Sequence, residues 1–205
     1  MIDWDMLISS FIVLWAVIDP VGTVPVFLAV TKNYEAEEKK RIAKNSALVA
    51  FTILVFFIVV GEVLLKQMGV PLPAFQVSGG IILFIFAVDM IFGNSKPEGE
   101  IQMIKSVQET AVFPLAIPSI ASPGAILATM LLTDNSRNSI VNQFITTGIL
   151  ALIILITYFL MRSSAPIHKR IGNSGAIVIS KVMGLILASI AATNILLGIK
   201  EFFKL

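Results

Sequence analysis

The spacing of the charged residues constrains the fold of this chain more than any other feature. Long uncharged runs alternate with short charged segments, and 22 uncharged residues separate Lys66 from Asp89 while 24 separate Glu109 from Asp134. A helix that crosses a bilayer needs about 20 predominantly apolar residues. The runs therefore predict an all-α, polytopic membrane protein. Six spans are predicted, at about 6–31, 45–65, 73–92, 110–132, 140–161 and 176–199.

Composition supports the same class. Of the 205 residues, 57% are hydrophobic and only 14% are charged. A soluble domain has about 25% charged residues, and one small globule cannot bury so much apolar surface, so we expect a lipid bilayer as partner. The net charge of +2 indicates no nucleic-acid partner.

Residue types also restrict the chemistry. The chain has no Cys and a single His, His168, which excludes thiol catalysis, thiolate metal sites and His-cluster metal sites. No span carries paired carboxylates and no phosphate-binding glycine loop occurs, so we expect neither an enzyme nor an ATP-driven pump. We therefore predict no catalytic residue, no metal and no cofactor. The acidic N-terminus lacks the features of a signal peptide, so the first apolar segment should stay in the mature protein.

Basic residues predict the orientation. The loops 32–44, 93–109 and 162–175 together hold ten Lys and Arg residues, whereas the opposite face holds four. Because positive residues are retained in the cytoplasm, both termini are predicted to lie outside a multi-pass protein of the cell inner or plasma membrane.

The chain also has an internal repeat. At an offset of 103, Asp19-Pro20 falls on Ser122-Pro123, and at an offset of 104 five apolar-helix residues of 80–91 match those of 184–195. Each half has three spans, so the halves insert in opposite directions, an architecture of many secondary transporters. We predict a single membrane domain, 1–205, with repeat 1 at about 1–95, repeat 2 at about 108–205 and a cytoplasmic linker at about 93–109.

Two interruptions in the apolar segments mark the candidate site. Asp19-Pro20-Val21-Gly22 breaks the first span and Ser122-Pro123-Gly124-Ala125 breaks the fourth. Asp and Ser are favoured N-caps and Pro is favoured at the first helical position, so a second half-helix is predicted to begin at each break. Proline kinks are ordinary in membrane helices, and a kink is the favoured interpretation for Pro114 and Pro118. At the two breaks a binding site is favoured, because polar cap, proline and small residue occur together twice.

A half-helix start near the bilayer midplane offers free N–H groups and a positive dipole, which attract a carboxylate. A substrate carboxylate is therefore predicted to bind the N–H groups of Gly22-Thr23 and Gly124-Ala125. A substrate ammonium would meet freed carbonyls near Ile18 or Ala121, or the Asp19 carboxylate. The predicted substrate-binding residues are Asp19, Pro20, Gly22, Thr23, Ser122, Pro123, Gly124 and Ala125.

Other polar residues in the spans are candidates for ion coupling or for the transport pathway: Asp19, Asp89, Thr193 and Asn194. Asp19 could cap a helix, bind an ammonium or carry a coupling proton. A structural ion pair between Asp89 and Lys181 is the favoured interpretation of those two residues. Thr193 and Asn194 could equally make interhelical hydrogen bonds.

Three further segments have structural interpretations. Glu35–Lys44 places acids before bases in helical spacing and predicts a solvated helix start. Ser78-Gly79-Gly80 and Gly184 predict close helix contacts, because small residues let backbones approach.

The segments DPVGTVPVFLAVT (19–31) and FPLAIPSIASPGAI (113–126) resemble the signature regions of the MarC family of integral membrane proteins. The likeness covers essentially the whole chain. It departs from the family at Ser122, where members commonly carry Gly. The family includes SnatA-type small neutral amino acid transporters. The resemblance therefore implies transport of glycine, alanine or a similar small neutral amino acid, coupled to a proton (H+) or sodium (Na+) gradient.

The function predicted is therefore secondary transport of small neutral amino acids. The alternative is an uncoupled exporter or channel with the same architecture. The chain lacks the catalytic residues that an intramembrane enzyme would need. A structural subunit would have no use for two helix breaks, which are energetically costly inside a membrane. The preferred amino acid, the coupling ion, the direction of transport and the formation of a homo-oligomer are left open.

Overall fold

The computed structural model describes residues 4–92, 106–134 and 139–204, and these residues contain helices and no strand. The all-α class is therefore confirmed. Most of the predicted linker 93–109 lies outside the described residues. The helices are α1 (Trp4–Ile18), α2 (Thr23–Val30), α3 (Ala36–Gln67), α4 (Leu72–Phe92), α5 (Val107–Thr110), η2 (Ala111–Ile120), α6 (Pro123–Leu132), α7 (Ile140–Arg162) and α8 (Ser164–Phe203).

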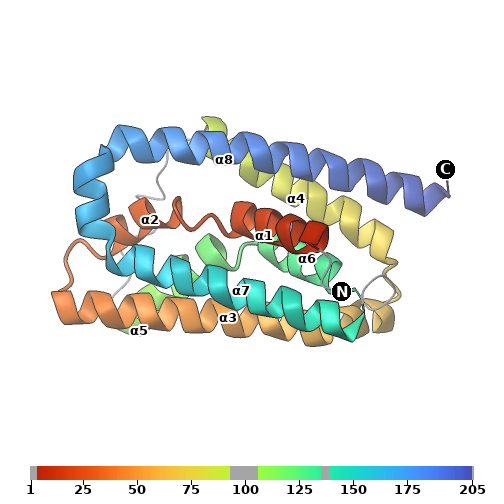
Figure 1. Cartoon of the computed structure of the whole chain (residues 1–205), viewed down its shortest axis with the longest axis horizontal. Helices are drawn as coiled ribbons and strands as arrows, with labels where there is room; N and C mark the ends of the chain where they lie inside the picture. The colour runs from red at the N-terminus through yellow and green to blue at the C-terminus, as the bar shows by residue number, and fades with distance from the viewer. Residues whose placement is uncertain (1–3, 93–105, 135–138, 205) are drawn as a thin grey trace.

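The helices lie in three layers along one long axis (Figure 1). One outer layer is the pair α4 and α8, and the other is the pair α3 and α7. The interrupted segments α1–α2 and η2–α6 lie between these layers and contact both. The start of α1 and the end of α8 lie toward the same end of the bundle (Figure 1).

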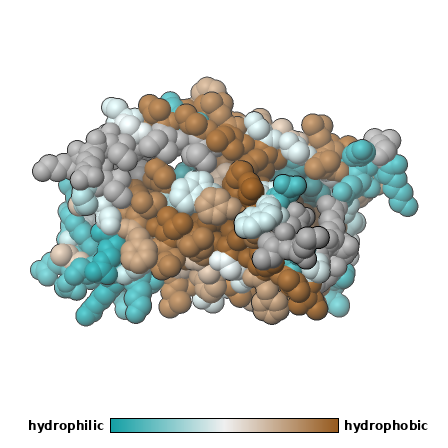
Figure 2. All heavy atoms as spheres, viewed as in Figure 1, coloured by the Kyte–Doolittle hydropathy of each residue, from teal (hydrophilic) through white to brown (hydrophobic). Residues whose placement is uncertain are grey.

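Apolar side chains form a broad band over the middle of the molecule, and hydrophilic side chains gather at its two ends (Figure 2). Within the described residues, four helices are long and apolar enough to cross a membrane, and a fifth span results if α5–η2 and α6 count as one. The chain is thus a multi-pass membrane protein. The first predicted span, 6–31, is divided between the shorter apolar helix α1 and the helix α2, so a total of six spans stays a prediction.

Local sequence signals explain both ends of α3. Its start is a capping box, in which Glu35 and Glu38 each accept the other's backbone N–H. Its end is a turn in which Gly69, at φ 65°, lets Gly69 N–H reach Lys66 O and Val70 N–H reach Leu65 O. The predicted helix start in Glu35–Lys44 is therefore confirmed.

Glycines bring α4 and α8 together. A Cβ on Gly80 would lie 3.1 Å from Ala191 O, and a Cβ on Gly198 would lie 2.8 Å from Pro73 O. The close helix contact predicted for Gly80 is confirmed, and Gly79 packs instead against Leu127 of α6. Ser78 is exposed and donates to carbonyls of its own helix.

Two predictions about the segments near α8 are wrong. The predicted loop 162–175 is helical, because α8 begins at Ser164 and crosses one end of the bundle before it turns to run along α4 (Figure 1). The charges of 164–175 in the sequence therefore do not mark the end of a helix. The predicted ion pair between Asp89 and Lys181 is not formed. Both side chains are exposed, and the ion pairs between described residues are Lys40–Glu37 and Lys66–Glu62.

Candidate functional site

The first break is built around Asp19, which follows the last residue of α1 with a φ of 46°. Asp is one of the few residues that tolerate this left-handed conformation. Its N–H completes the last turn of α1 by donating to Trp15 O at 3.0 Å. Its Oδ1 accepts the N–H of Gly22 at 2.9 Å, and its carbonyl oxygen accepts the N–H of Thr23 at 3.0 Å. Asp19 therefore ends one helix and caps the turn that precedes the next.

This geometry corrects the prediction that Pro20 opens the second half-helix. Residues 20–22 form a separate turn, and α2 begins at Thr23 with Gly22 as its N-cap and no side-chain cap. The left-handed φ of Asp19 redirects the chain, so a full turn is needed before regular helix resumes. The Thr23 hydroxyl also donates to Asp19 O at 3.0 Å.

The second break follows the predicted pattern. Ser122 is the N-cap of α6 with extended backbone, its Oγ accepts the N–H of Ala125 at 3.0 Å, and Pro123 is the first helical residue. The helix preceding this break is bent by 58° relative to α6.

The segment before the second break is irregular because of Pro114 and Pro118. The residues before them, Phe113 and Ile117, have non-helical φ and ψ, as proline requires of its predecessor, and both peptide bonds into proline are cis. Because the φ and ψ values of the preceding residues leave the helical region, each proline interrupts the helix, whereas the sequence predicted only a kink.

The two breaks meet in the protein interior. Ser122 Oγ donates to Val17 O at 3.2 Å, and this buried hydrogen bond joins residues 105 positions apart. Thr23 Oγ1 and Ser119 Oγ lie 3.4 Å apart. The last turn of α1 and the start of α6 are thus directly connected, so the structure brings the two predicted halves of the site together.

Most of the predicted site residues are buried: Asp19, Pro20, Thr23, Ser122, Gly124 and Ala125, whereas Gly22 is half-buried and Pro123 is exposed. The N–H groups of Gly22, Thr23 and Ala125 already have acceptors within the chain. Of the four groups predicted to hold a carboxylate, only Gly124 N–H has no acceptor among the described residues. A ligand must therefore displace internal hydrogen bonds or bind at the side of α6 that carries Gly124.

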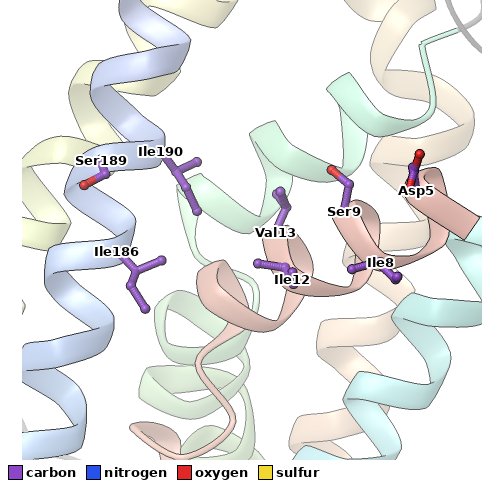
Figure 3. Close-up of a pocket in the computed structure, with 8 residues that line it drawn as sticks. All are labelled: Asp5, Ile8, Ser9, Ile12, Val13, Ile186, Ser189 and Ile190. Carbon is purple, nitrogen blue, oxygen red and sulfur yellow. The ribbon is translucent and has the colours of Figure 1, made fainter.

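An open cavity of about 530 Å³ lies between α1 and α8 (Figure 3). Four of its eight lining residues are isoleucines, and Asp5 lies toward one end. Neither break lines this cavity, which the sequence did not predict. The lining residues are Asp5, Ile8, Ser9, Ile12, Val13, Ile186, Ser189 and Ile190.

The remaining pathway candidates lie away from the breaks on the outer pair of helices. Asp89 on α4 is exposed, Thr193 on α8 is exposed and donates to Ser189 O at 2.9 Å, and Asn194 is half-buried. For Thr193 this bond is within its own helix and not between helices. The described residues include no group of three or more His, Cys, Asp or Glu side chains that could hold a metal ion.

Sequence reasoning missed two buried polar side chains, Gln76 and Thr146. Gln76 Oε1 and Thr146 Oγ1 are both buried without a hydrogen-bond partner in the described part of the chain. Such groups are uncommon in protein interiors. Their positions inside uncharged runs were a visible signal.

Comparison with known proteins identifies the family. The family model described as MarC family integral membrane protein matches residues 4–203. The chain belongs to the MarC family. The MarC relatives include the UPF0056 membrane protein MJ1677 of Methanocaldococcus jannaschii, 34% identical over 97% of this chain and 98% of its own length.

Two further relatives of this MarC chain are similar over their whole length. The UPF0056 membrane protein PH0760 of Pyrococcus horikoshii is 36% identical over 96% of this chain and 97% of its own. The UPF0056 membrane protein YvbG of Bacillus subtilis is 35% identical over 98% of this chain and 97% of its own. No solved structure matches the chain.

Proposed function

We propose that this MarC protein is a secondary transporter of small neutral amino acids such as glycine and alanine, driven by a proton or sodium gradient. The observation that carries the proposal is the buried hydrogen bond between Ser122 Oγ and Val17 O, which joins the two helix breaks. Paired discontinuous helices that meet at mid-membrane are where secondary transporters bind substrate and coupling ion. The small residues of the breaks favour a small substrate, and the buried Asp19 carboxylate suits an ammonium or a proton.

We also propose six spans in two inverted three-span repeats, with both termini outside. The helix contacts follow such a symmetry: α4 contacts α6 as α8 contacts α2, and α3 contacts η2 as α7 contacts α1. The ends of α2 and α6 are also alike. Thr31 Oγ1 donates to Phe27 O and Thr133 Oγ1 donates to Thr129 O, each at 2.6 Å and four residues back. Rocking of the α4–α8 pair against the α3–α7 pair would then expose the breaks alternately.

The test is uptake of labelled glycine and alanine into liposomes that contain the purified protein, with and without proton or sodium gradients. Asp19→Asn is the informative variant, because Asn tolerates the φ of 46° and can still accept the Gly22 N–H while it removes the charge. Glu37→Gln is the matched control, since that acid is exposed at the start of α3 and pairs with Lys40.

We expect saturable uptake that one gradient drives, that Glu37→Gln retains and that Asp19→Asn reduces to the level of protein-free liposomes. If Asp19→Asn keeps gradient-driven uptake and Asp89→Asn loses it, the coupling group is Asp89. Flux that never saturates and shows no counterflow would favour the channel. Absence of flux for every small neutral amino acid would refute the transporter.

A further inference from the structure

We infer that Leu83 of α4 is the residue that closes the binding region beside the first turn of α6 and sets the largest side chain that the transporter accepts. The inference rests on the proposed function for the identity of the substrate. Its structural part, the closure, stands on the packing of α4 against α6.

Leu83 lies directly over Gly124, the second residue of α6. A Cβ added to Gly124 would lie 2.3 Å from Leu83 Cδ1, so the leucine side chain occupies the space that a side chain at position 124 would need. Leu83 is only 1% exposed, and Gly124 is buried. The leucine therefore covers the Cβ side of Gly124, the residue whose N–H has no acceptor among the described residues.

Ser122 and Ala125 of the same turn are both fully buried, whereas Pro123, which precedes Gly124, is exposed. A small ligand that reaches Gly124 must therefore fit in the volume that Leu83 leaves. In an apolar pocket, one additional methylene group changes discrimination between substrates about 10- to 200-fold. A branched leucine at this place is thus large enough to separate alanine from valine.

The second repeat carries the same pattern. Gly80, Leu83 and Ala87 on α4 correspond to Gly184, Leu187 and Ala191 on α8, and all of these positions are buried. As α4 contacts α6, so α8 contacts α2. Each of these two long helices therefore carries a leucine at the matching position, Leu83 on α4 and Leu187 on α8. We assign substrate selection to Leu83 because its contact with Gly124 is direct.

The chain provides a matched control in Leu127. Leu127 projects from α6 onto Gly79 of α4, and a Cβ on Gly79 would lie 2.5 Å from Leu127 Cδ2. Leu127 is also 1% exposed, so Leu83→Ala and Leu127→Ala remove equal side chains from the same interface. The difference is position, because Leu127 lies one turn beyond the break.

The first experiment compares liposome uptake of glycine, alanine and valine by the parent protein and the two variants. We expect the valine-to-glycine uptake ratio to rise about tenfold in Leu83→Ala and to stay at the parent value in Leu127→Ala. Equal ratios in the two variants would overturn the assignment of specificity to Leu83. If the parent transports none of these amino acids, the proposed function fails, and the closure is decided by the second experiment.

The second experiment uses the absence of cysteine from the chain. Ala125→Cys places a single thiol in the first turn of α6, and its reaction rate with 2-aminoethyl methanethiosulfonate measures access to that turn without any substrate. We expect the thiol to react several-fold faster when Leu83→Ala is added and at an unchanged rate when Leu127→Ala is added. Equal rates with both substitutions would show that Leu83 does not close the site.

Discussion

The two breaks have the same order of polar residue, proline and small residue, yet they satisfy their hydrogen bonds differently. At the first break, the Asp19 carboxylate accepts the N–H of Gly22 from a left-handed backbone, and regular helix resumes only at Thr23. At the second break, Ser122 has extended backbone and α6 begins at the next residue. A charged cap and a neutral cap therefore produce two kinds of helix start, one with an acid in the interior and one without.

The comparison separates two roles for the transporter proposed above. The first break holds the one acid among the buried break residues, and the second holds the hydroxyl that joins the two breaks. Coupling of transport to the proton or sodium gradient is thus expected at the first break. Selection of the substrate by side-chain size is expected at the second, where Leu83 covers Gly124. Substitutions that affect one break and not the other test this division.

The largest effect is expected from Gly22→Ala. The added Cβ would lie 1.9 Å from Asp19 Oδ2, so the carboxylate must leave its hydrogen bond with Gly22 N–H. Overpacking together with the lost bond should lower the free energy of unfolding by about 3 kcal/mol. Denaturant unfolding in detergent measures this change.

Gly148→Ala on α7 is the control for Gly22→Ala. Nothing lies within 4 Å of a Cβ at Gly148, so this change should be neutral or should stabilise the protein by up to about 1 kcal/mol. Similar losses for Gly22→Ala and Gly148→Ala would mean that the contact with Asp19 does not constrain the first break.

Asp19→Ala is expected to have the next largest effect. Alanine loses the cap on Gly22 N–H and is strained at a φ of 46°, so the free energy of unfolding should fall by about 2 kcal/mol. Asp19→Asn should cost about 0.5 kcal/mol, since Asn tolerates the backbone conformation and caps as well as Asp. Thermal unfolding measures both variants. Equal losses of stability in Asp19→Ala and Asp19→Asn would contradict this explanation.

Ser122→Ala is expected to cost less than Asp19→Ala, about 1.5 kcal/mol, because it removes the cap on Ala125 N–H and the bond to Val17 O. Ser139→Ala is the matched change: Ser139 caps α7 through Asn142 N–H and makes no bond to a second helix within the described part of the chain.

We expect Ser139→Ala to cost about 0.5 kcal/mol, so the difference of about 1 kcal/mol measures the connection between the two breaks. Equal costs in chemical unfolding would show that the bond between Ser122 and Val17 contributes nothing to stability.

Much of the architecture could be predicted from local patterns. The charge-free runs placed the long membrane helices, and Ser122-Pro123 placed the start of α6. The pattern failed where a charge was taken for the end of a helix, since α8 runs as helix through the predicted loop 162–175. It also failed at Asp19-Pro20, because the left-handed φ of Asp19 postpones α2 to Thr23.

The site was predictable in position and not in detail. Asp19 and Ser122 are the polar residues at the two breaks, as the sequence indicates, but three of the four N–H groups predicted to be free have internal acceptors. Sequence cannot show this, because competition between a ligand and an internal acceptor depends on side-chain orientation. Gln76 and Thr146 were visible as polar residues in uncharged runs, but only the packing shows that both are buried without partners in the described part of the chain.

The sequence by itself determined the membrane class, the long helices and the places where two of the apolar segments break. These properties are local: a charge-free run partitions into lipid, and proline lacks an N–H wherever it lies. Only the tertiary structure decided that Ser122 reaches Val17 and that Leu83 covers Gly124. Those contacts join residues far apart in the chain, and they exist only when the helices pack at one particular register.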